Sequence, residues 1–228
     1  MLATIAWISI AVAFACALWI AVDEARHPQA MAIMNIVWPV TALYLSVFAL
    51  WGYYRLGRKK TKGSMQLHAM PMKGAAQGNT PTAGQVAVGT SHCGAGCMLA
   101  DVLCEFWIAS AGIMLFGSML WAEYAIDFAA AWALGIVFQY FAIQPMRHLP
   151  FGQALVAAIK ADTLSILAFQ IGMYAWMALV FFRLFPSPHL TPFEPQYWLM
   201  MQIAMICGYA TSFPMNWWLI RAGLKEAM

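Results

Sequence analysis

Charged side chains are scarce in this chain. Only 9% of its 228 residues are Asp, Glu, Lys or Arg, whereas 63% are hydrophobic and the mean hydropathy is +0.70. A soluble domain averages about 25% charged and about 45–50% apolar residues. The shortage of charge therefore excludes an ordinary soluble domain and indicates that most of the chain lies in lipid.

Several sequence signatures are also missing. The chain has no phosphate-binding glycine loop ending in Lys-Ser or Lys-Thr and no His-Glu-x-x-His motif. All five histidines fall in loops or at the ends of apolar runs, which excludes haem ligation within the membrane. Five cysteines at scattered spacings imply no disulfide framework. We therefore expect no haem, nucleotide or flavin cofactor.

Long apolar runs, in contrast, are frequent. A run of roughly 20 apolar residues is long enough to cross the hydrocarbon core as a helix. The sequence predicts an all-α fold, a single transmembrane domain over residues 1–228 that forms a polytopic bundle of about six helices. The expected spans are Leu2–Val22, Met31–Tyr54, Cys97–Leu120, Ala125–Ile143, Thr163–Phe182 and Tyr197–Ile220.

The segments between these spans carry the remaining expectations. A signal peptide is the alternative for the first run, but a basic start and an Ala-x-Ala site are missing there. Residues 55–91, rich in Gly, Lys, Thr and Gln, are predicted to be a flexible cytoplasmic loop. Glu123 and Asp127 are expected to mark a turn. Phe151–Lys160 is expected as an interfacial helix, because Phe151–Phe185 is too long for one perpendicular span.

Positive charge is distributed unevenly. With the amino terminus inside, ten Lys and Arg residues fall in inner loops, and only Arg26 and Arg183 fall in outer loops. This positive-inside bias predicts that both termini are cytoplasmic. Six of the twelve basic residues lie between Arg55 and Lys73, which indicates a cytoplasmic loop rather than a nucleic-acid-binding surface.

Thiols, an imidazole and acids gather in residues 92–105, where the third expected span begins. If this segment is helical, four of its residues recur at every fourth position and form one stripe, with His92 at the mouth of the helix. The stripe consists of Cys93, Cys97, Asp101 and Glu105. Thiolate and imidazole ligands select Cu(I) or Zn(II). The Cys-x3-Cys spacing is neither a zinc-ribbon knuckle nor a thioredoxin motif.

A second soft ligand set alternates in the expected cytoplasmic loop. It consists of His68, Met70 and Met72. Imidazole and thioether groups suit Cu(I), so this segment is a candidate arm for acquiring or delivering the ion. The alternative is a flexible linker with no metal role.

Polar residues at three helix ends are expected to meet. An acid in the hydrocarbon region costs on the order of 2.5–3.5 kcal/mol, so it normally faces a partner or a cavity. Lys160 and Asp162 enter the fifth expected span at the depth of the stripe, and Asn216 and Arg221 leave the sixth span there. The sequence predicts that these residues, His92 and the stripe form one cytoplasmic-side cluster. The alternative is that acid–base pairs and small cysteines merely hold helices together.

Five long motifs resemble a known family. They are Met31–Ala42, His92–Cys97, Lys160–Ser165, Phe169–Tyr174 and Thr211–Arg221. The chain is similar to the bacterial membrane group called domain of unknown function 4396, DUF4396. The resemblance covers nearly the whole chain apart from Arg55–Thr90. It implies a bacterial multi-pass membrane protein, and it implies neither an activity nor catalytic residues.

The functional hypothesis therefore comes from the residues. It is a protein of the bacterial inner membrane that binds or transports a soft transition metal, with Cu(I) ahead of Zn(II). Cys93, Cys97 and His92 are the expected ligands, and Asp101 and Glu105 are expected to act as outer groups or proton partners. One alternative is an accessory or assembly subunit whose polar cluster fixes helix packing, and another is a thiol–disulfide oxidoreductase. We assign no catalytic residue and expect lipid and metal-delivery or other membrane proteins as partners.

Overall fold

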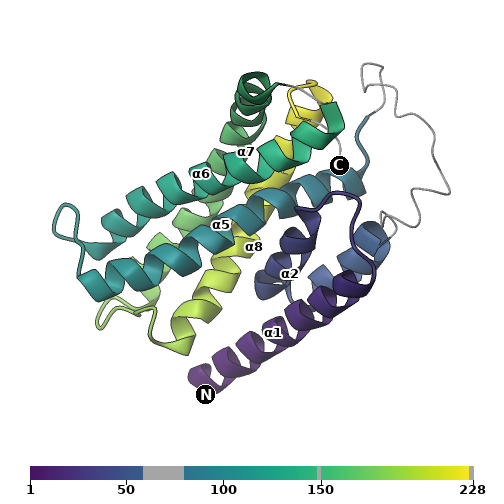
Figure 1. Cartoon of the computed structure of the whole chain (residues 1–228). Coiled ribbons are helices and arrows are strands. Elements are labelled where there is room, and N and C mark those ends of the chain that lie inside the picture. The colour runs from purple at the N-terminus through teal and green to yellow at the C-terminus, as the bar shows by residue number, and fades with distance from the viewer. Residues whose placement is uncertain (59–79, 148–149, 226–228) are drawn as a thin grey trace.

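The computed structural model describes residues 1–58, 80–147 and 150–225. Within these ranges the chain forms helices and no strand, which confirms the all-α prediction. Figure 1 shows the helices as one bundle, with α1 and α2 along one side and α5 to α8 forming the rest. The elements are α1 (Leu2–Arg26), α2 (Met34–Leu45), α3 (Val47–Gly52), the π-helix η1 (Tyr53–Gly57), α5 (Ala83–Ala111), α6 (Met119–Arg147), α7 (Phe151–Leu179), the π-helix η3 (Val180–Leu184) and α8 (Pro195–Arg221).

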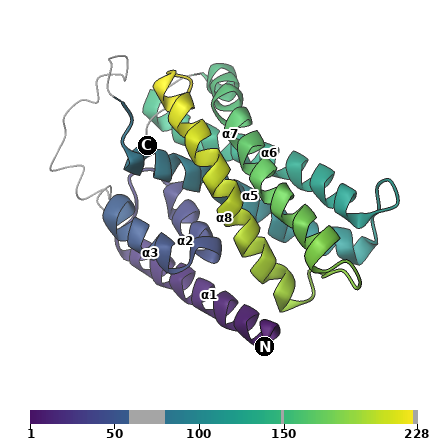
Figure 2. The same cartoon turned by 180° about the vertical axis from the view of Figure 1, so that it is seen from behind.

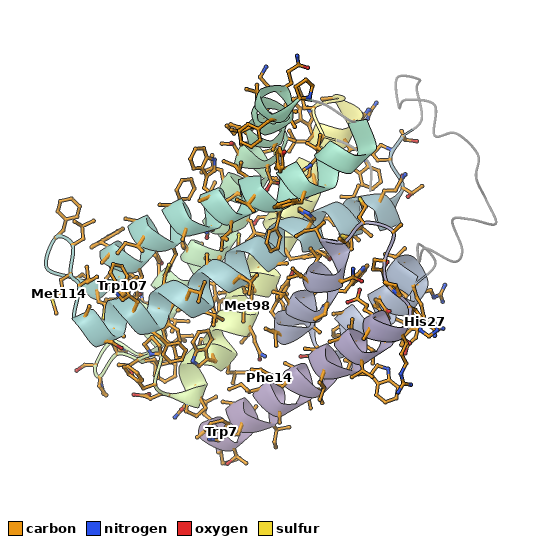
Figure 3. The ribbon with its side chains drawn as sticks, in the orientation of Figure 1. Trp7, Phe14, His27, Met98, Trp107 and Met114 are labelled. Atoms are coloured by element: carbon orange, nitrogen blue, oxygen red, sulfur yellow. The ribbon has the colours of Figure 1, made fainter. Side chains whose placement is uncertain are left out.

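Four segments are long and apolar enough to cross a membrane. They are α1, α5, α6 as far as Ile143, and α7 together with η3. Trp7 and Phe14 of α1 are each 62% exposed and Trp107 of α5 is 58% exposed. Figure 3 labels these three side chains on the bundle. Large exposed apolar surfaces are unfavourable in water. The bundle therefore has the character of a membrane protein, and length and composition support four of the six expected spans.

The second expected span is interrupted. Met31–Tyr54 divides into α2, α3 and η1, so the prediction of one continuous helix was wrong. Ser46 has φ 48°, a left-handed conformation that a helix cannot continue through, and it ends α2. Pro39 lies inside α2 and removes a backbone donor there. With 12 residues, α2 is too short to cross the hydrocarbon core by itself.

Helix α5 begins well before the third expected span. Thr82 is its N-cap, and Thr82 and Gln85 bond each other in a capping box that fixes the start at Ala83. Gly112, at φ 63°, ends the helix. The predicted loop over residues 55–91 was therefore wrong for residues 55–57, which belong to η1, and for residues 83–91, which belong to α5.

Helix α7 replaces the expected interfacial helix and span. It runs without a break from Phe151 to Leu179 and continues as η3, so the division near Lys160 was wrong. At about 1.5 Å per residue, α7 is roughly 44 Å long, and a tilted helix of this length can remain continuous through the bilayer. This places Asp162 well inside the helix.

Glycines set the closest contacts between helices. Where α5 crosses α6, a Cβ atom on Gly96 would lie 3.4 Å from the backbone nitrogen of Gly135. Where α7 crosses α8, a Cβ atom on Gly172 would lie 2.6 Å from the carbonyl oxygen of Cys207. Figure 2 shows α8 crossing the rear of the bundle beside α7. Small residues let the helix backbones approach this closely, as is usual in membrane bundles.

Gln202 links the amino-terminal helices α1 and α2 to α8. Gln202 of α8 donates its Nε2 hydrogen to the carbonyl oxygen of Leu43 at 2.8 Å and accepts a bond from the hydroxyl of Ser9 at 2.6 Å. Because Ser9 lies on α1 and Leu43 on α2, a single side chain connects three helices. The hydrophobic core is continuous from α1 to α8.

Candidate functional site

The predicted stripe forms a buried face of α5. Cys93, Cys97 and Asp101 are 0% exposed and Glu105 is 2% exposed. Since α5 begins at Ala83, these residues and His92 lie in the interior of the helix, and the prediction that His92 stands at its mouth was wrong. The free backbone N–H groups of a helix start therefore do not act on the thiols.

One end of the stripe joins a cluster with α7 and the segment after α8. Lys225 donates from Nζ to Cys93 Sγ at 3.0 Å and to Asp162 Oδ1 at 2.9 Å. The Cys93 thiol donates to the same Oδ1 at 2.9 Å, and its sulfur lies 3.0 Å from the hydroxyl of Ser165. We call Cys93, Asp162, Ser165 and Lys225 the Lys225 cluster. All four side chains are buried, and Lys225 and Asp162 form an ion pair with both side chains 0% exposed.

Helix α8 supports this cluster from behind. The Ser212 hydroxyl donates to the carbonyl oxygen of Ser165 at 3.0 Å. Asn216 in turn donates from Nδ2 to the Ser212 hydroxyl at 2.9 Å. Both side chains are 0% exposed. The predicted meeting of Cys93, Asp162 and Asn216 is therefore confirmed as one hydrogen-bonded network.

Lys225 itself was missed by the sequence analysis. After α8 the chain reverses at Gly223, which has φ 71°, and the N–H groups of Leu224 and Lys225 both bond the carbonyl oxygen of Leu219. Only this turn returns the lysine to the bundle interior. A glycine just past a helix end is a readable turn signal, but it does not show what the following side chain will contact.

The charge of Lys225 is maintained by its neighbours. Burial by itself lowers the pKa of an ammonium group, because the charged form loses its hydration. The Asp162 carboxylate and the Cys93 sulfur outweigh this effect and raise the pKa of Lys225 above its ordinary value. The cluster therefore contains a positively charged group at neutral pH.

The sequence suggested that Lys160 pairs with Asp162 and Arg221 with Glu105, and the structure shows neither pair among the described residues. Lys160 and Arg221 are both exposed, and Asp162 pairs with Lys225 instead. The titratable groups that act on Glu105 are Tyr197, Asp101 and Asp127, and Arg221 is not among them. Lys160 and Arg221 therefore do not belong to the buried cluster.

The other end of the stripe meets a second group of acids. Asp101 and Glu105 of α5 face Glu123 and Asp127 of α6, and Tyr197 of α8 lies against the same group. We call these five residues the acid cluster. Each of them is at most 6% exposed. Glu123 and Asp127 were expected at a turn, and that prediction was wrong because both lie inside α6.

Polar atoms in the acid cluster remain unpaired. Neither carboxyl oxygen of Asp101 has a hydrogen-bond partner among the described residues. The Glu105 carboxyl group is close enough to Tyr197 and Asp127 to share a hydrogen bond with them. No Lys or Arg side chain that the structure describes forms an ion pair with the four carboxyl groups. Buried polar groups are normally hydrogen-bonded, so these atoms mark a place where a proton or an ion is needed.

His92 lies beside the Lys225 cluster, where the backbone of Phe138 is close enough to act on its ring. It is 0% exposed and packs edge-to-face on Phe138, with ring centroids 5.8 Å apart. Neither ring nitrogen has a hydrogen-bond partner among the described residues. Asp162 and Lys225 are close enough for their charges to act on the imidazole.

The metal prediction gains no direct support from these positions. Within residues 1–58, 80–147 and 150–225, no three His, Cys, Asp or Glu side chains are placed to hold one ion. Cys93 and Cys97 are both free and buried. The second soft ligand set, His68, Met70 and Met72, lies outside the described residues.

Together the fold and these two clusters define a helical bundle of membrane-protein type with a polar interior. Residues 83–225 match the family model described as Domain of unknown function (DUF4396). Because this match covers more than half of the chain, the protein belongs to the DUF4396 family, as its motifs indicated. The matched region runs from the first residue of α5 to Lys225, and it therefore contains both clusters. The chain has no significant similarity to a curated protein or to a solved structure.

Proposed function

We propose that this chain is an integral membrane protein that moves a cation through the interior of its bundle, with buried carboxyl groups as the carriers. The observation that carries the proposal is the acid cluster. Four carboxyl groups lie together on α5 and α6, two helices that are long and apolar enough to cross a membrane. None of them forms an ion pair with a described Lys or Arg side chain.

Electrostatics explains why this arrangement needs an exchangeable ion. An isolated carboxylate in a low-dielectric interior is strongly unfavourable, and four neighbouring carboxylates are more so. The group is neutral when its members hold protons, and it becomes a cation site when protons leave. Chains of acids inside membrane proteins commonly mark proton relays and ion pathways for this reason.

The stripe extends the pathway along the bundle. Successive members are four residues apart on α5, so each step advances about 6 Å, and the three steps from Cys93 to Glu105 cover about 18 Å of a roughly 30 Å core. Titratable groups therefore run from the Lys225 cluster to the acid cluster along one buried face. The positive-inside bias supports cytoplasmic termini and a place in the bacterial inner membrane.

Flux measurements on reconstituted protein test the proposal. We expect proteoliposomes with the wild-type chain to carry a proton flux, reported by a pH-sensitive dye inside the vesicles, that empty vesicles lack. Asp101→Asn and Glu105→Gln are each expected to reduce this flux tenfold or more, in the range of about 1.4 kcal/mol or above. The matched control is Glu24→Gln, because Glu24 is also buried with both oxygens unpaired but lies on α1, away from the acid cluster.

Two results would overturn it. Wild-type vesicles that carry no more protons, Zn(II) or Cu(I) than empty ones would exclude a pathway. A flux that Glu24→Gln reduces as much as Asp101→Asn would show that the acid cluster has no special role.

A second candidate is an assembly or accessory subunit in which polar residues fix helix packing. The buried Lys225–Asp162 pair favours it, because this pair ties the segment after α8 to α7 and α5. This candidate predicts that wild-type vesicles show no flux and that variants of the Lys225 cluster lose folded protein.

A further inference from the structure

We propose that the Lys225 cluster is a cation site occupied by the ammonium group of Lys225, and that a soft or borderline metal ion binds there when Lys225 leaves. The inference rests on the proposed function, because a metal bound at one end of the stripe would be the cation that the pathway carries. It names the class of cargo, with Zn(II) as the ion to test.

The geometry is that of a cation surrounded by donors from two helices. Nζ of Lys225 lies 3.0 Å from Cys93 Sγ, 2.9 Å from Asp162 Oδ1 and 3.5 Å from Ser165 Oγ. These donors come from α5 and α7, whereas the ammonium comes from the separate segment after α8. The three donor residues and Lys225 are all buried, so the site is already formed around a positive charge.

The donors suit a metal of the soft or borderline class. A thiolate and a carboxylate are ligands that Zn(II) accepts, and the thiolate also suits Cu(I). The second carboxyl oxygen, Asp162 Oδ2, has no partner among the described residues and is available as a further donor. His92 lies beside the cluster, and its ring nitrogens are likewise unpaired in the described part of the chain.

Metal binding requires the ligands to move closer together and the Cys93 thiol to lose its proton. A metal–sulfur bond is about 2.3 Å, shorter than the observed contact with the ammonium, so the donors must close by several tenths of an ångström or more. The Cys93 thiol releases one proton to solvent when its sulfur becomes a thiolate ligand. Once Lys225 has left, Cys93 and Asp162 are the charged ligands that remain, so the metal needs a further ligand, such as His92 or water, to complete its coordination.

The segment that carries Lys225 is otherwise exposed. Ala222, Gly223 and Leu224 are exposed, and Lys225 is the one buried side chain that the structure describes beyond α8. Two backbone bonds to the carbonyl oxygen of Leu219 hold the turn. Withdrawal of the lysine therefore exposes little other surface.

A glycine on α6 maintains room beside the donors. A Cβ atom on Gly135 would lie 2.8 Å from Asp162 Oδ2 and would also collide with the Ile166 side chain. Any larger residue at position 135 would displace Asp162 Oδ2 from its observed position. The close approach of α6 therefore shapes the site as well as the helix packing.

Metal binding to purified protein tests the inference directly. Lys225→Met removes the ammonium and retains a long side chain, and we expect it to bind about one equivalent of Zn(II) more than wild type; Zn(II) is the probe because the new thioether would itself attract Cu(I). The double variants Lys225→Met/Cys93→Ser and Lys225→Met/Asp162→Asn are expected to lose this additional metal. Lys160→Met is the matched control, because Lys160 is exposed on α7 and near in sequence to Asp162.

A second readout keeps the test decisive if Lys225→Met folds poorly. The metal is expected to raise the thermal unfolding midpoint of Lys225→Met and to leave that of Lys160→Met unchanged, because a ligand that binds only the folded state stabilises it. Lys225→Met with no additional metal and no metal-dependent stabilisation would overturn the inference. So would additional metal that persists after Cys93→Ser.

The two proposals fail separately. Equilibrium binding in detergent requires no transport, so additional metal in Lys225→Met without any flux in vesicles would support the site and reject the pathway. A proton flux that depends on Asp101, together with no metal in Lys225→Met, would do the reverse.

Discussion

Two carboxylate–base pairs in this protein have the same contact distance and very different surroundings. At the end of α1, Arg58 donates from Nε to Asp23 Oδ2 at 2.9 Å, and its side chain is 42% exposed. In the bundle interior, Lys225 donates to Asp162 Oδ1 at 2.9 Å with both side chains 0% exposed. Distance alone therefore does not distinguish the two pairs, whereas solvent does.

The environment determines what each pair contributes. An exposed pair is screened by water and salt, and it typically contributes little to stability. A buried pair gains little net energy from its formation, but the loss of one partner leaves an uncompensated charge inside the protein. The Asp23–Arg58 pair is therefore a surface contact between the end of α1 and the residue after η1. In the Asp162–Lys225 pair, each buried charge needs the other to be stable.

The neighbours sharpen this contrast. Tyr53 donates its hydroxyl to Asp23 Oδ2 at 2.7 Å, which completes an ordinary hydrogen-bonded corner. Asp162 instead shares its lysine with a thiol and a hydroxyl, the donor types that bind metals. The same acid–base motif thus forms a structural contact in one region and a candidate binding site in the other.

The largest effect is expected from breaking the buried pair on one side. Asp162→Ala leaves Lys225 charged and unpaired, and it should destabilise the protein by about 3–5 kcal/mol. Thermal or denaturant unfolding in detergent measures this change. Adding Lys225→Met in the same chain removes the orphaned charge and should restore most of the loss. A double variant as unstable as the single one would contradict this account of the pair.

A smaller effect is expected from crowding the buried pair. Gly135→Ala inserts a methyl group against Asp162 and Ile166, and overpacking of this kind costs about 1–3 kcal/mol. Gly152→Ala on α7 is the control, since a Cβ atom there meets nothing within 4 Å. Equal unfolding midpoints for the two variants would show that the contact at Gly135 is not tight.

The exposed pair should be much less sensitive. Asp23→Asn removes the charge that Arg58 contacts, and the resulting shift in the unfolding midpoint is expected to be several-fold smaller than that of Asp162→Ala. Added salt should weaken the wild-type contact, because surface charges are screened. If Asp23→Asn proved as harmful as Asp162→Ala, solvent exposure would not be the deciding difference.

The smallest effect concerns pH. Lys225 has a pKa raised above its ordinary value, so its contribution is complete below the pKa of a free lysine, about 10.4, and is lost only as pH rises through the raised value. The stability difference between wild type and Lys225→Met/Asp162→Asn, which leaves neither charge unpaired, should therefore remain flat from about pH 6 to about pH 9. A steep change within this window would indicate that Lys225 titrates there.

Local patterns explain which parts of the site were predictable. The four-residue spacing from Cys93 to Glu105 requires only that the segment be helical, and the cost of burying acids then predicts that they face a partner. The start of α5 also had a readable signal, since Thr82-x-x-Gln85 has the form of a capping box. The early start was missed because the preceding residues 55–81 resemble a loop in composition.

The remaining features depend on contacts between distant residues. Lys225 reaches Cys93, 132 positions earlier in the chain, through a reversal at Gly223 that no local pattern connects to α5. Glu123 and Asp127 look like turn residues, because acids seldom lie inside a span without a base. In the structure they face two acids of α5 and Tyr197 of α8, an arrangement visible only in three dimensions.

The most direct test of the central claim is the infrared spectrum of the resting protein at neutral pH. The account predicts C=O stretching bands of protonated carboxyl groups that shift in heavy water and are lost when Asp101, Glu105, Glu123 and Asp127 are changed together to their amides. The same bands should persist in Glu24→Gln apart from the contribution of that one residue. A spectrum with only ionised carboxylates, or one that the fourfold change leaves intact, would contradict a pathway that operates by exchanging protons in the acid cluster.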